Sequence, residues 1–372
     1  MNKLSLNLPL NNLSFGFVSI NLLREFCKLG LNPSIEPIGN VDLSSFEGVI
    51  EQPFIDWLQK AANNFQAKHK RNIPTFKLWH IQSSLSSNSE KQYLYTFHEL
   101  DQLTEFEINV LNNQEGVMVS NDFSKKVFEV NGVDNTVRIP LGFDKDSFFK
   151  TERPAYDDDK IITFGVFGKF EARKNTELVV KTLCKLYGNN PKYRIHCQIF
   201  NPFLGRNAQE IEENNKRVCA MLTENGKYFN VNFFPYFKTN RELNSLINSV
   251  DVVVDGSGGE AWSFGAFHAL GIGKHAVLHN TTGIKEWANE ENSVLIAPNG
   301  KKPAADGMFF HQGAPYNQGN VFTFDPSALE NALKLAEERV RKNRINEAGL
   351  ELQKKFTWEN TAKQILEAIK VN

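Results

Sequence analysis

The chain reads VVVDGSGGEAWSFGAFHAL from residue 252 to residue 270, and this stretch decides the fold. Its first residues, 252–254, are apolar and β-branched, which indicates a buried strand. A glycine-rich turn follows, and an apolar helical pattern begins near Ser263. Because the first turn of a helix has N–H groups without a partner, the backbone of Ser263 and Phe264 can bind a phosphate. The stretch therefore predicts a strand, a turn and a helix that together form an anion site.

Two ionisable side chains of this stretch are candidates for chemistry. Glu260 lies in the turn, where a carboxylate can accept hydrogen bonds from ligand hydroxyl groups. It could instead stabilise the dipole of the helix from its N-terminal end. His268 lies one to two turns into the helix, where a histidine can either bind a ligand or belong to the core.

A second turn, GVFGKFEARKN at 165–175, also joins a predicted strand to a predicted helix. Gly168 allows a close approach of the backbone, and Lys169, Arg173 and Lys174 supply positive charge. Such a turn suits a diphosphate, although a solvated basic turn has the same composition.

The rest of the chain alternates predicted strands and helices in two series. They occupy residues 1–150 and 160–355, and a charged segment at 144–160 separates them. We expect an α/β protein with two Rossmann-like βαβ domains that face each other across a cleft. Ligands of such sheets bind at the carboxyl ends of the strands. Two final helices are predicted at 326–353 and 357–369, and we expect the segment 357–372 to pack back on the first domain.

The composition narrows the class of protein. The 372 residues have a net charge of −1, so nothing indicates the basic face of a nucleic-acid-binding protein. The four cysteines lack metal-ligand spacing, and we expect reduced thiols in a cytoplasmic protein. No apolar run approaches the length of a membrane span and the N-terminus does not read as a signal peptide, so we expect no transmembrane segment.

The stretch at 257–270 resembles the retaining GT-B glycosyltransferases of family four, also called glycosyl transferases group 1. Their C-terminal domain carries Pro-Ser-x-x-Glu-Gly-Phe-Gly, with a second glutamate eight positions after the first. Ser257 and Glu260 match this motif, and the Phe-Gly pair at 264–265 lies near the expected place. The resemblance implies that Glu260 binds hydroxyl groups of the donor sugar. It implies that the backbone at 263–264 binds the distal phosphate.

The sequence departs from the family at His268, where the family has the glutamate that binds the nucleotide ribose. A neutral imidazole still hydrogen-bonds a hydroxyl group. It gives up a charge-assisted bond of roughly 1.5–3 kcal/mol for a neutral one of about 1 kcal/mol. We therefore expect the donor affinity or the nucleotide preference to differ at this position.

The resemblance covers residues 92–148 and 160–297. It places the diphosphate clamp at Gly168, Lys169, Arg173 and Lys174, where lysine at 169 keeps the charge of the family's arginine without its bidentate fork. It places the loop that meets the base at 230–237, with Tyr236 and Phe237 as candidates.

On the first domain, the resemblance assigns the predicted loop at 11–16 to the region beneath the phosphates and the acceptor, with Gly16 as its single glycine. The family often has a histidine near the transferred sugar, after the strand predicted here at 93–97. His98 is our candidate for this role, and His80, at the end of another predicted strand, is its rival.

The resemblance implies transfer of a sugar from a nucleoside-diphosphate donor, such as a UDP- or GDP-sugar, to an acceptor that no residue identifies. It implies retention of configuration and no required metal or other cofactor, with His98, Glu260 and Lys174 as catalytic candidates. A sugar-nucleotide-binding protein that has lost catalysis is one alternative. Another GT-B enzyme, such as a phosphorylase or an epimerase, is the other.

Two further segments carry expectations of their own. The Asp-x-Asp at 157–159 binds a divalent metal in the other main glycosyltransferase fold, but here it lies in the predicted linker, so we assign no metal site. The irregular segment at 300–318 is long for a compact domain and has an apolar centre, so we expect it to cover part of the donor cleft.

Overall fold

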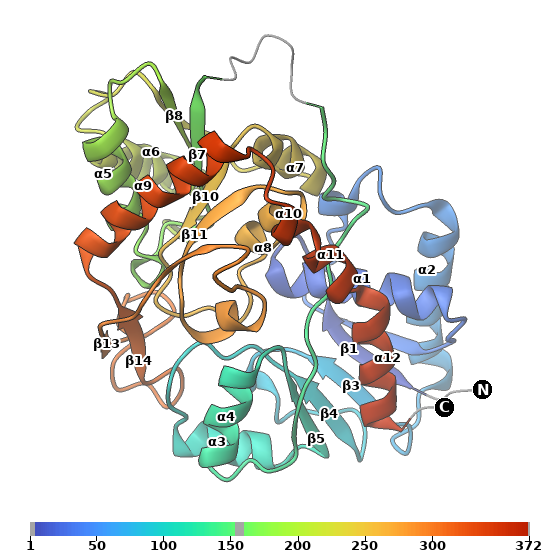
Figure 1. The fold of residues 1–372 in the computed structure, drawn as a ribbon. Helices are drawn as coiled ribbons and strands as arrows, with labels where there is room; N and C mark the ends of the chain where they lie inside the picture. The colour runs from blue at the N-terminus through green and yellow to red at the C-terminus, as the bar shows by residue number, and fades with distance from the viewer. Residues whose placement is uncertain (1–3, 153–159, 371–372) are drawn as a thin grey trace.

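The first of two parallel β-sheets lies in the N-terminal half of the chain. The computed structural model describes residues 4–152 and 160–370 (Figure 1). Within these ranges the first sheet has the order β2-β1-β3-β4-β5-β6. Its strands are β1 (Ser5–Pro9), β2 (Ser34–Ile38), β3 (Thr75–Leu78), β4 (Gln92–Tyr95), β5 (Gly116–Val119) and β6 (Thr136–Arg138). The strand order reverses between β1 and β3, so the loops after these two strands open at one crevice.

The second sheet has the order β12-β11-β10-β7-β8-β9, again parallel among the described strands. Its reversal lies between β7 and β10, so the two turns that the sequence singles out meet at the same crevice. The prediction of an α/β protein with two Rossmann-like βαβ domains is confirmed. The strands are β7 (Ile162–Phe167), β8 (Tyr193–Gln198), β9 (Val231–Phe233), β10 (Val252–Asp255), β11 (His275–His279) and β12 (Val294–Ile296).

Helices cover both faces of each sheet (Figure 1). Those of the first half are α1 (Ser14–Lys28), α2 (Gln52–Lys68), α3 (Glu105–Asn112) and α4 (Asp122–Val130), with the short turns η1 (Ser44–Phe46) and η2 (Ile81–Ser83). Those of the second half are α5 (Thr176–Tyr187), α6 (Ala208–Leu222), α7 (Asn240–Asn248), α8 (Phe264–Gly271) and α9 (Pro326–Lys342), with η3 (Ala172–Lys174) and η4 (Thr282–Glu286). Reciprocal capping boxes begin α3 and α7, because a threonine and a glutamate three residues later satisfy each other's backbone N–H groups.

The predicted single helix at 326–353 is wrong. After α9 the chain turns out of the helix at Asn343 and continues as α10 (Glu347–Leu350) and α11 (Leu352–Lys355). The reason is Asn346, which is buried. Its side-chain amide donates to the carbonyls of Asn292 and Lys274 and its side-chain oxygen caps α10. These bonds replace helical ones.

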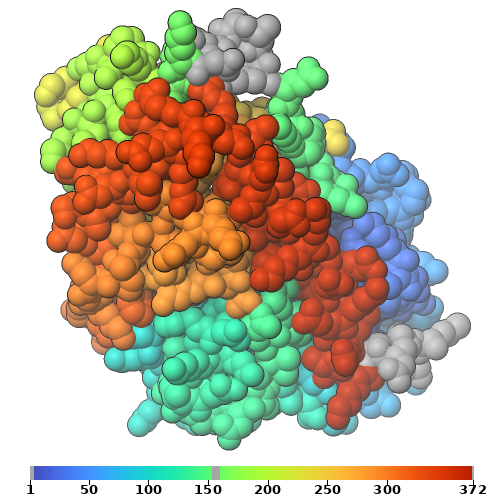
Figure 2. All heavy atoms as spheres, in the orientation of Figure 1, coloured from blue at the N-terminus to red at the C-terminus, as the bar shows by residue number. Residues whose placement is uncertain are grey.

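The final helix, α12 (Trp358–Ile369), leaves the second domain and packs against α1 of the first (Figure 1). Figure 2 shows this C-terminal segment running over the visible face of both halves. Thr361 Oγ1 donates to the carbonyl of Pro140 at 2.8 Å, which ties α12 to the end of the first sheet.

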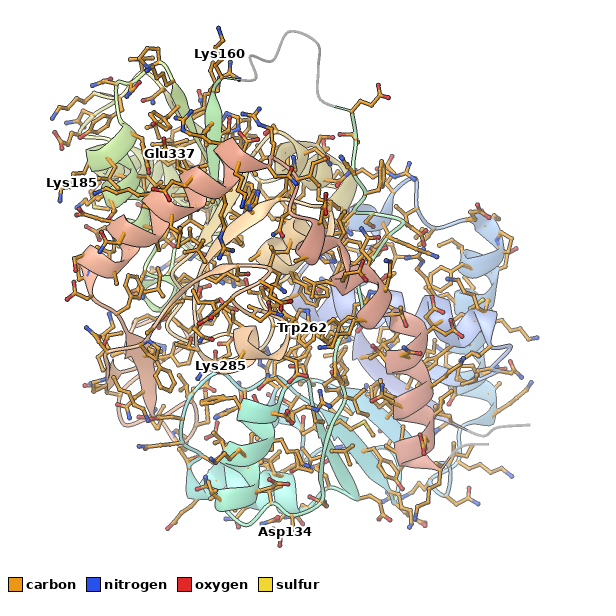
Figure 3. The ribbon with its side chains drawn as sticks, in the orientation of Figure 1. Asp134, Lys160, Lys185, Trp262, Lys285 and Glu337 are labelled. Atoms are coloured by element: carbon orange, nitrogen blue, oxygen red, sulfur yellow. The ribbon has the colours of Figure 1, made fainter. Side chains whose placement is uncertain are left out.

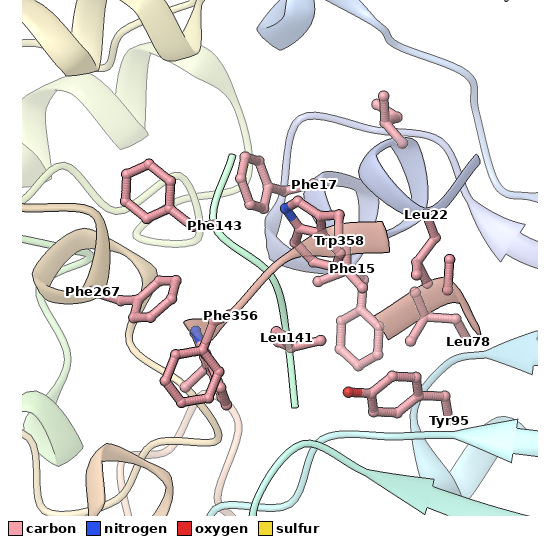
Figure 4. Packing of buried hydrophobic residues seen from close by; sticks show 14 of the residues in the cluster. Phe15, Phe17, Leu22, Leu78, Tyr95, Leu141, Phe143, Phe267, Phe356 and Trp358 are labelled. Atoms are coloured by element: carbon pink, nitrogen blue, oxygen red, sulfur yellow. The ribbon is translucent and has the colours of Figure 1, made fainter. Parts of the chain in front are cut away.

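One hydrophobic cluster continues through the junction of the two domains (Figure 4). It takes Phe17 from α1, Phe143 from the connecting segment, Phe267 from α8 and Trp358 from α12. The rings of Phe143 and Phe267 lie 5.8 Å apart, and those of Phe17 and Trp358 lie 6.2 Å apart. The two domains are therefore held together by buried apolar surface as well as by polar contacts.

The prediction that 300–318 is irregular throughout is wrong for its first residues. β13 (Gly300–Pro303) pairs with β14 (Asn320–Thr323) as an antiparallel hairpin. We call the residues between these strands, 304–319, the strap loop.

Candidate functional site

A buried group of charges lies at the switch point of the second sheet. Glu260 follows β10, and Arg173 and Lys174 end the turn that follows β7. The Glu260 carboxylate accepts a hydrogen bond from Lys174 Nζ through Oε1 and lies 3.0 Å from Arg173 Nη1. Arg173 and Glu260 are buried, and the Lys174 side chain is only 16% exposed. The structure thus brings together three residues that the sequence places on two separate turns.

Ion pairing keeps these groups charged in spite of their burial. Burial by itself raises the pKa of a carboxyl group, but Lys174 and Arg173 lower the pKa of Glu260 to about 2. Burial likewise acts to lower the pKa of Lys174, but the charge of Glu260 raises it. Near neutral pH the site therefore presents a carboxylate and two cations in a region from which most water is excluded.

Two further carboxylates complete the group. Glu171 Oε2 lies 3.0 Å from Arg173 Nη2, and its Oε1 lies 3.0 Å from Lys169 Nζ. Glu99, which comes from the first domain after β4, approaches Arg173 Nε at 3.4 Å. Burial, together with Glu260 and Glu171, raises the pKa of Glu99 against the effect of Arg173. Sequence reasoning missed both acids. The sequence offers only two signals for these acids. Glu171 lies within the basic turn, and Glu99 lies beside His98.

The turn before α8 is held in an unusual backbone conformation. Ser263 has φ 64° and ψ 72°, a region that a residue other than glycine adopts only when its surroundings hold it there. Its Oγ donates to one oxygen of Asp255, and the N–H and Oγ of Ser257 donate to the other at 2.9 and 2.5 Å. Asp255 therefore fixes both ends of the turn that carries Glu260. Trp262, in the middle of this turn, is buried at the centre of the molecule (Figure 3).

Gly168 has φ 116°, which favours glycine, and a Cβ there would lie 3.6 Å from the Lys174 side chain. The backbone of the turn at 165–175 therefore passes directly beside the Lys174 ammonium group. Phe264 opens α8 on the other side of this crevice and contacts Phe17 of the first domain at 4.8 Å between ring centroids.

His268 is separated from these charges and lies among aromatic rings. It stacks on Phe148 with 4.0 Å between centroids and an angle of 16°, and it contacts Phe17 and Phe143 edge to face. Its Nε2 accepts a long hydrogen bond, 3.4 Å, from the backbone N–H of Asp144. Burial lowers the pKa of His268 to about 3, so the imidazole is neutral at physiological pH.

On the first domain, the loop predicted at 11–16 is shorter than expected, because α1 begins at Ser14. Gly16 lies in the first turn of this helix, where a Cβ would come within 1.9 Å of the Asn11 carbonyl oxygen. The glycine therefore lets the loop after β1 fold tightly against the start of α1. His98 is buried, with its ring 5.4 Å from that of Phe128 on α4.

Comparison with known proteins was made by family, by sequence and by structure. No protein-family model matches the chain. No curated protein matches it by sequence. Solved structures do match over its whole length. The sucrose-phosphate synthase of Thermosynechococcus elongatus is 14% identical with a TM-score of 0.68, over 100% of this chain and 98% of that one. Anabaena HepE, solved with UDP and glucose, is 14% identical with a TM-score of 0.66, over 100% of both chains.

The glycosyltransferase WaaG, involved in lipopolysaccharide biosynthesis, is 10% identical with a TM-score of 0.62 over 99% of both chains. These matches extend over both domains of the present chain. The chain has the GT-B fold.

In a GT-B protein the two domains face each other across a cleft, and here several groups meet from both sides. Tyr236, after β9, directs its Oη to the Asn12 carbonyl of the first domain at 3.4 Å, and its ring lies 5.9 Å from that of Phe200. Phe237 lies 6.4 Å from Phe234. Tyr236 thus borders the cleft at the β9 side of the sheet, whereas Phe237 lies in the same loop and contacts Phe234 of its own domain.

The β13–β14 hairpin and the strap loop between its strands join the two domains of this GT-B fold. Asp101 accepts hydrogen bonds from the N–H of Asn320 at 2.7 Å and from Lys301 Nζ at 2.9 Å. Thr104 Oγ1 donates to the carbonyl of Pro315 at 2.6 Å. At the same time, Phe310 of the loop lies 6.0 Å from the Arg173 guanidinium group. The loop therefore rests on the first domain while it covers the charged group of the second.

Lys169 is held between aromatic rings at the edge of the strap loop. Its ammonium group lies 4.9 Å from the ring centroid of Phe309 and 5.0 Å from that of Phe203. A cation in this position is attracted to the faces of both rings.

Within residues 4–152 and 160–370, no three His, Cys, Asp or Glu side chains gather into a cluster that could hold a metal ion. The Asp-x-Asp at 157–159 lies outside the described residues. Among the described helices, none combines the length and hydrophobicity that a bilayer span requires.

Proposed function

We propose that the protein is a glycosyltransferase that moves a sugar from a nucleoside-diphosphate donor to an acceptor, with retention and without a metal. The observation that supports this best is the contact of Glu260 with Lys174 and Arg173 at the switch point of the second sheet. This is where open α/β sheets bind their ligands. The GT-B fold supports the same class, since Anabaena HepE has been solved with UDP-glucose and a trehalose-6-phosphate protein with UDP-2-fluoro glucose.

The chemistry follows from the charges. When the sugar leaves its donor, negative charge grows on the diphosphate. Lys174, Lys169 and the N–H groups at the start of α8 are placed to stabilise that charge. Glu260 stays ionised, so it can accept hydrogen bonds from sugar hydroxyl groups while it orients Lys174. Tyr236 and Phe237 remain the proposed contacts to the base.

The strap loop gives the second half of the mechanism. Because it closes over Arg173 and Lys169, it limits the access of water to the donor. A donor held in a dry site transfers its sugar to the acceptor in preference to water.

The test is a panel of UDP- and GDP-sugars with measurement of nucleotide release, followed by the variants Glu260→Gln and Lys174→Met. We expect each variant to lower turnover by about 100- to 1,000-fold, which is what one preorganised charge contact contributes in other enzymes. The matched controls are Glu177→Gln and Lys181→Met, because each removes one charge of an exposed ion pair on α5. If both site variants turn over the donor as wild type does, the proposed site is wrong.

The same panel separates the alternatives. Binding of a nucleotide sugar without any release of nucleotide indicates a protein that has lost catalysis. Release of sugar phosphate only when inorganic phosphate is added indicates a phosphorylase, and a changed sugar on an intact nucleotide indicates an epimerase. Retention is read from the anomeric signals of the product by NMR, and independence of metal from turnover in the presence of a chelator.

A further inference from the structure

Two histidines follow neighbouring strands of the first sheet and point to different places. β3 and β4 are parallel and paired, so residues after both strands lie at the same edge of the sheet. His80 comes after β3, and His98 comes after β4. This edge faces the second domain, since Glu99, next to His98, reaches Arg173. Either histidine could therefore have faced the cleft.

His98 faces the interior of its own domain. It is buried, and its ring contacts Phe128 on α4. Burial lowers its pKa, and the charge of Glu107 on α3 acts in the opposite direction. Its backbone carbonyl accepts a hydrogen bond from Ser124 Oγ at 2.8 Å, which holds this loop against α4. The ring is hydrogen-bonded by the backbone at Leu100 and Gln102 of the same domain, and its Nε2 has no partner among the described residues. The imidazole thus lies beneath α3 and α4 and not toward the second domain.

His80 is exposed, and its ring contacts two aromatic side chains. Phe15, in the first turn of α1, lies 4.5 Å from it, and Trp79 lies 5.1 Å from it. Phe15 is in turn supported by Phe97 at 4.7 Å. In the described chain, neither ring nitrogen of His80 has a recorded hydrogen-bond partner.

A charge on the donor side of the cleft also acts on His80. Although the imidazole reaches solvent, the protein atoms around it reduce its hydration and lower its pKa, and the positive charge of Lys169, on the other domain, lowers it further. A neutral imidazole has one N–H donor and one acceptor nitrogen, which suits a hydroxyl group, itself both donor and acceptor. Lys169 belongs to the turn proposed to contact the diphosphate, and His80 lies at the sheet edge from which Glu99 reaches Arg173 of that turn.

We propose that His80, and not His98, is the histidine of the first domain that hydrogen-bonds a substrate hydroxyl group at the reacting centre. This inference rests on the proposed function. The aromatic pair Phe15 and Trp79 fixes the direction of the imidazole and presents an apolar face to the C–H groups of a sugar. The hydroxyl belongs either to the transferred sugar or to the acceptor.

The experiment compares His80→Ala, His80→Gln and His98→Gln, with His69→Gln as the control, since the His69 ring at the end of α2 stacks on Phe65 and contacts the carbonyl of Asn88. We expect His80→Ala to lower kcat by about 10- to 100-fold, the effect of losing one hydrogen bond to a substrate in a dry site. His80→Gln should recover part of this loss, because its amide can still donate. His98→Gln and the control should stay within about threefold of wild type per folded molecule.

Hydrolysis of the donor without acceptor tells the two hydroxyl groups apart. A loss in hydrolysis as well as transfer by His80→Ala places the hydroxyl on the transferred sugar. A loss in transfer alone places it on the acceptor. Wild-type rates for His80→Ala, or an equal loss for His98→Gln, overturn the inference.

A binding measurement separates this inference from the proposed function. The imidazole signal of His80, identified in the NMR spectrum by its absence from His80→Gln, is followed while UDP-glucose is added. If UDP-glucose binds and turns over but neither this signal nor the rate of His80→Ala changes, the inference alone fails. If no donor of the panel binds or turns over, the proposed function is wrong, and so is the inference that rests on it.

Discussion

Residues 257–263 and residues 264–270 follow one another in the chain, yet the first half of this segment buries charge and the second half buries aromatic rings. In the first half, Glu260 is surrounded by Lys174 and Arg173, and Asp255 holds both ends of the turn. In the second half, His268 is neutral and stacks on Phe148. One short motif thus serves two different environments.

The difference bears on which part of the segment we propose as a ligand site. Buried charges lose their hydration, and they are tolerated only when partners surround them. Such a group is suited to exchange partners with a charged ligand. A neutral histidine packed among phenylalanines behaves as core and contributes to the contact between the domains.

The largest effect on stability is expected from Glu260→Gln, because it leaves Lys174 buried without its carboxylate. We expect a loss of about 3–5 kcal/mol in the free energy of unfolding near pH 7, measured with urea. The pKa of Glu260 is lowered from 4.5 to about 2, so its contribution is complete above pH 4.5 and is lost as the pH falls toward 2. Wild type and variant should therefore converge over that range. Glu177→Gln, on the surface of α5, should change stability by less than about 0.5 kcal/mol.

His268→Glu tests the second half directly, because it restores the residue of the family motif. We expect a loss of about 2–4 kcal/mol at pH 7, since the new carboxylate would be buried beside Phe148 and Phe17 without a cation. Burial would raise the pKa of the new group, so the loss should grow as the pH rises above about 4.5, whereas the loss caused by Glu260→Gln is already complete at that pH. A variant of unchanged stability that binds UDP-glucose more tightly would contradict the packed environment that we describe.

His268→Leu sharpens the same point through pH. The pKa of His268 is lowered from 6.5 to about 3. Between these two pH values the unfolded chain therefore binds a proton that the folded protein does not bind. Wild type should lose up to about 1.4 kcal/mol per pH unit from this group as the pH falls from 6.5 toward 3. The leucine variant should lack the part of this pH dependence that His268 contributes. A smaller pH dependence of stability should remain in the variant, because buried His279, whose pKa is lowered to about 4, acts in the same direction.

The smallest effect is expected from Phe148→Leu, which keeps an apolar side chain but removes the ring stacked on His268. We expect about 1 kcal/mol of destabilisation. Phe149→Leu is the matched control, since the neighbouring ring is 42% exposed and its loss should change little. Equal effects of the two substitutions would show that the stack on His268 contributes nothing.

Much of the fold could be predicted because it depends on local pattern. The strand at 252–254, the helix that begins near Ser263 and the final helix at 357–369 lie within one residue of where the sequence predicts them. Their apolar periodicity and their flanking turns are carried by neighbouring residues. The break at Asn343 and the hairpin at 300–323 could not be predicted in this way, because distant partners stabilise them, namely Asn292 for Asn346 and Asp101 for Asn320.

The same distinction between local patterns and distant contacts applies to the candidate site. The motif around Glu260 and the basic turn are local, and the sequence placed both at strand ends. What it could not reveal is that Glu99 joins them from the other domain, or that Phe148 and Phe17 close around His268. Those contacts depend on how the two domains are set against each other. His98 and His80 likewise have similar positions in the sequence pattern, and only the packing of α4 and α1 distinguishes their surroundings.

The position of α12 has a consequence for how the protein is made. This helix is translated after the whole second sheet, yet its Trp358, Ala362 and Ile365 belong to the core that surrounds α1. The first domain, although it leaves the ribosome first, therefore cannot finish its core while the second is still being synthesised. Until then α1 exposes apolar surface that a chaperone could bind, and translation stalled before residue 358 would leave an aggregation-prone product.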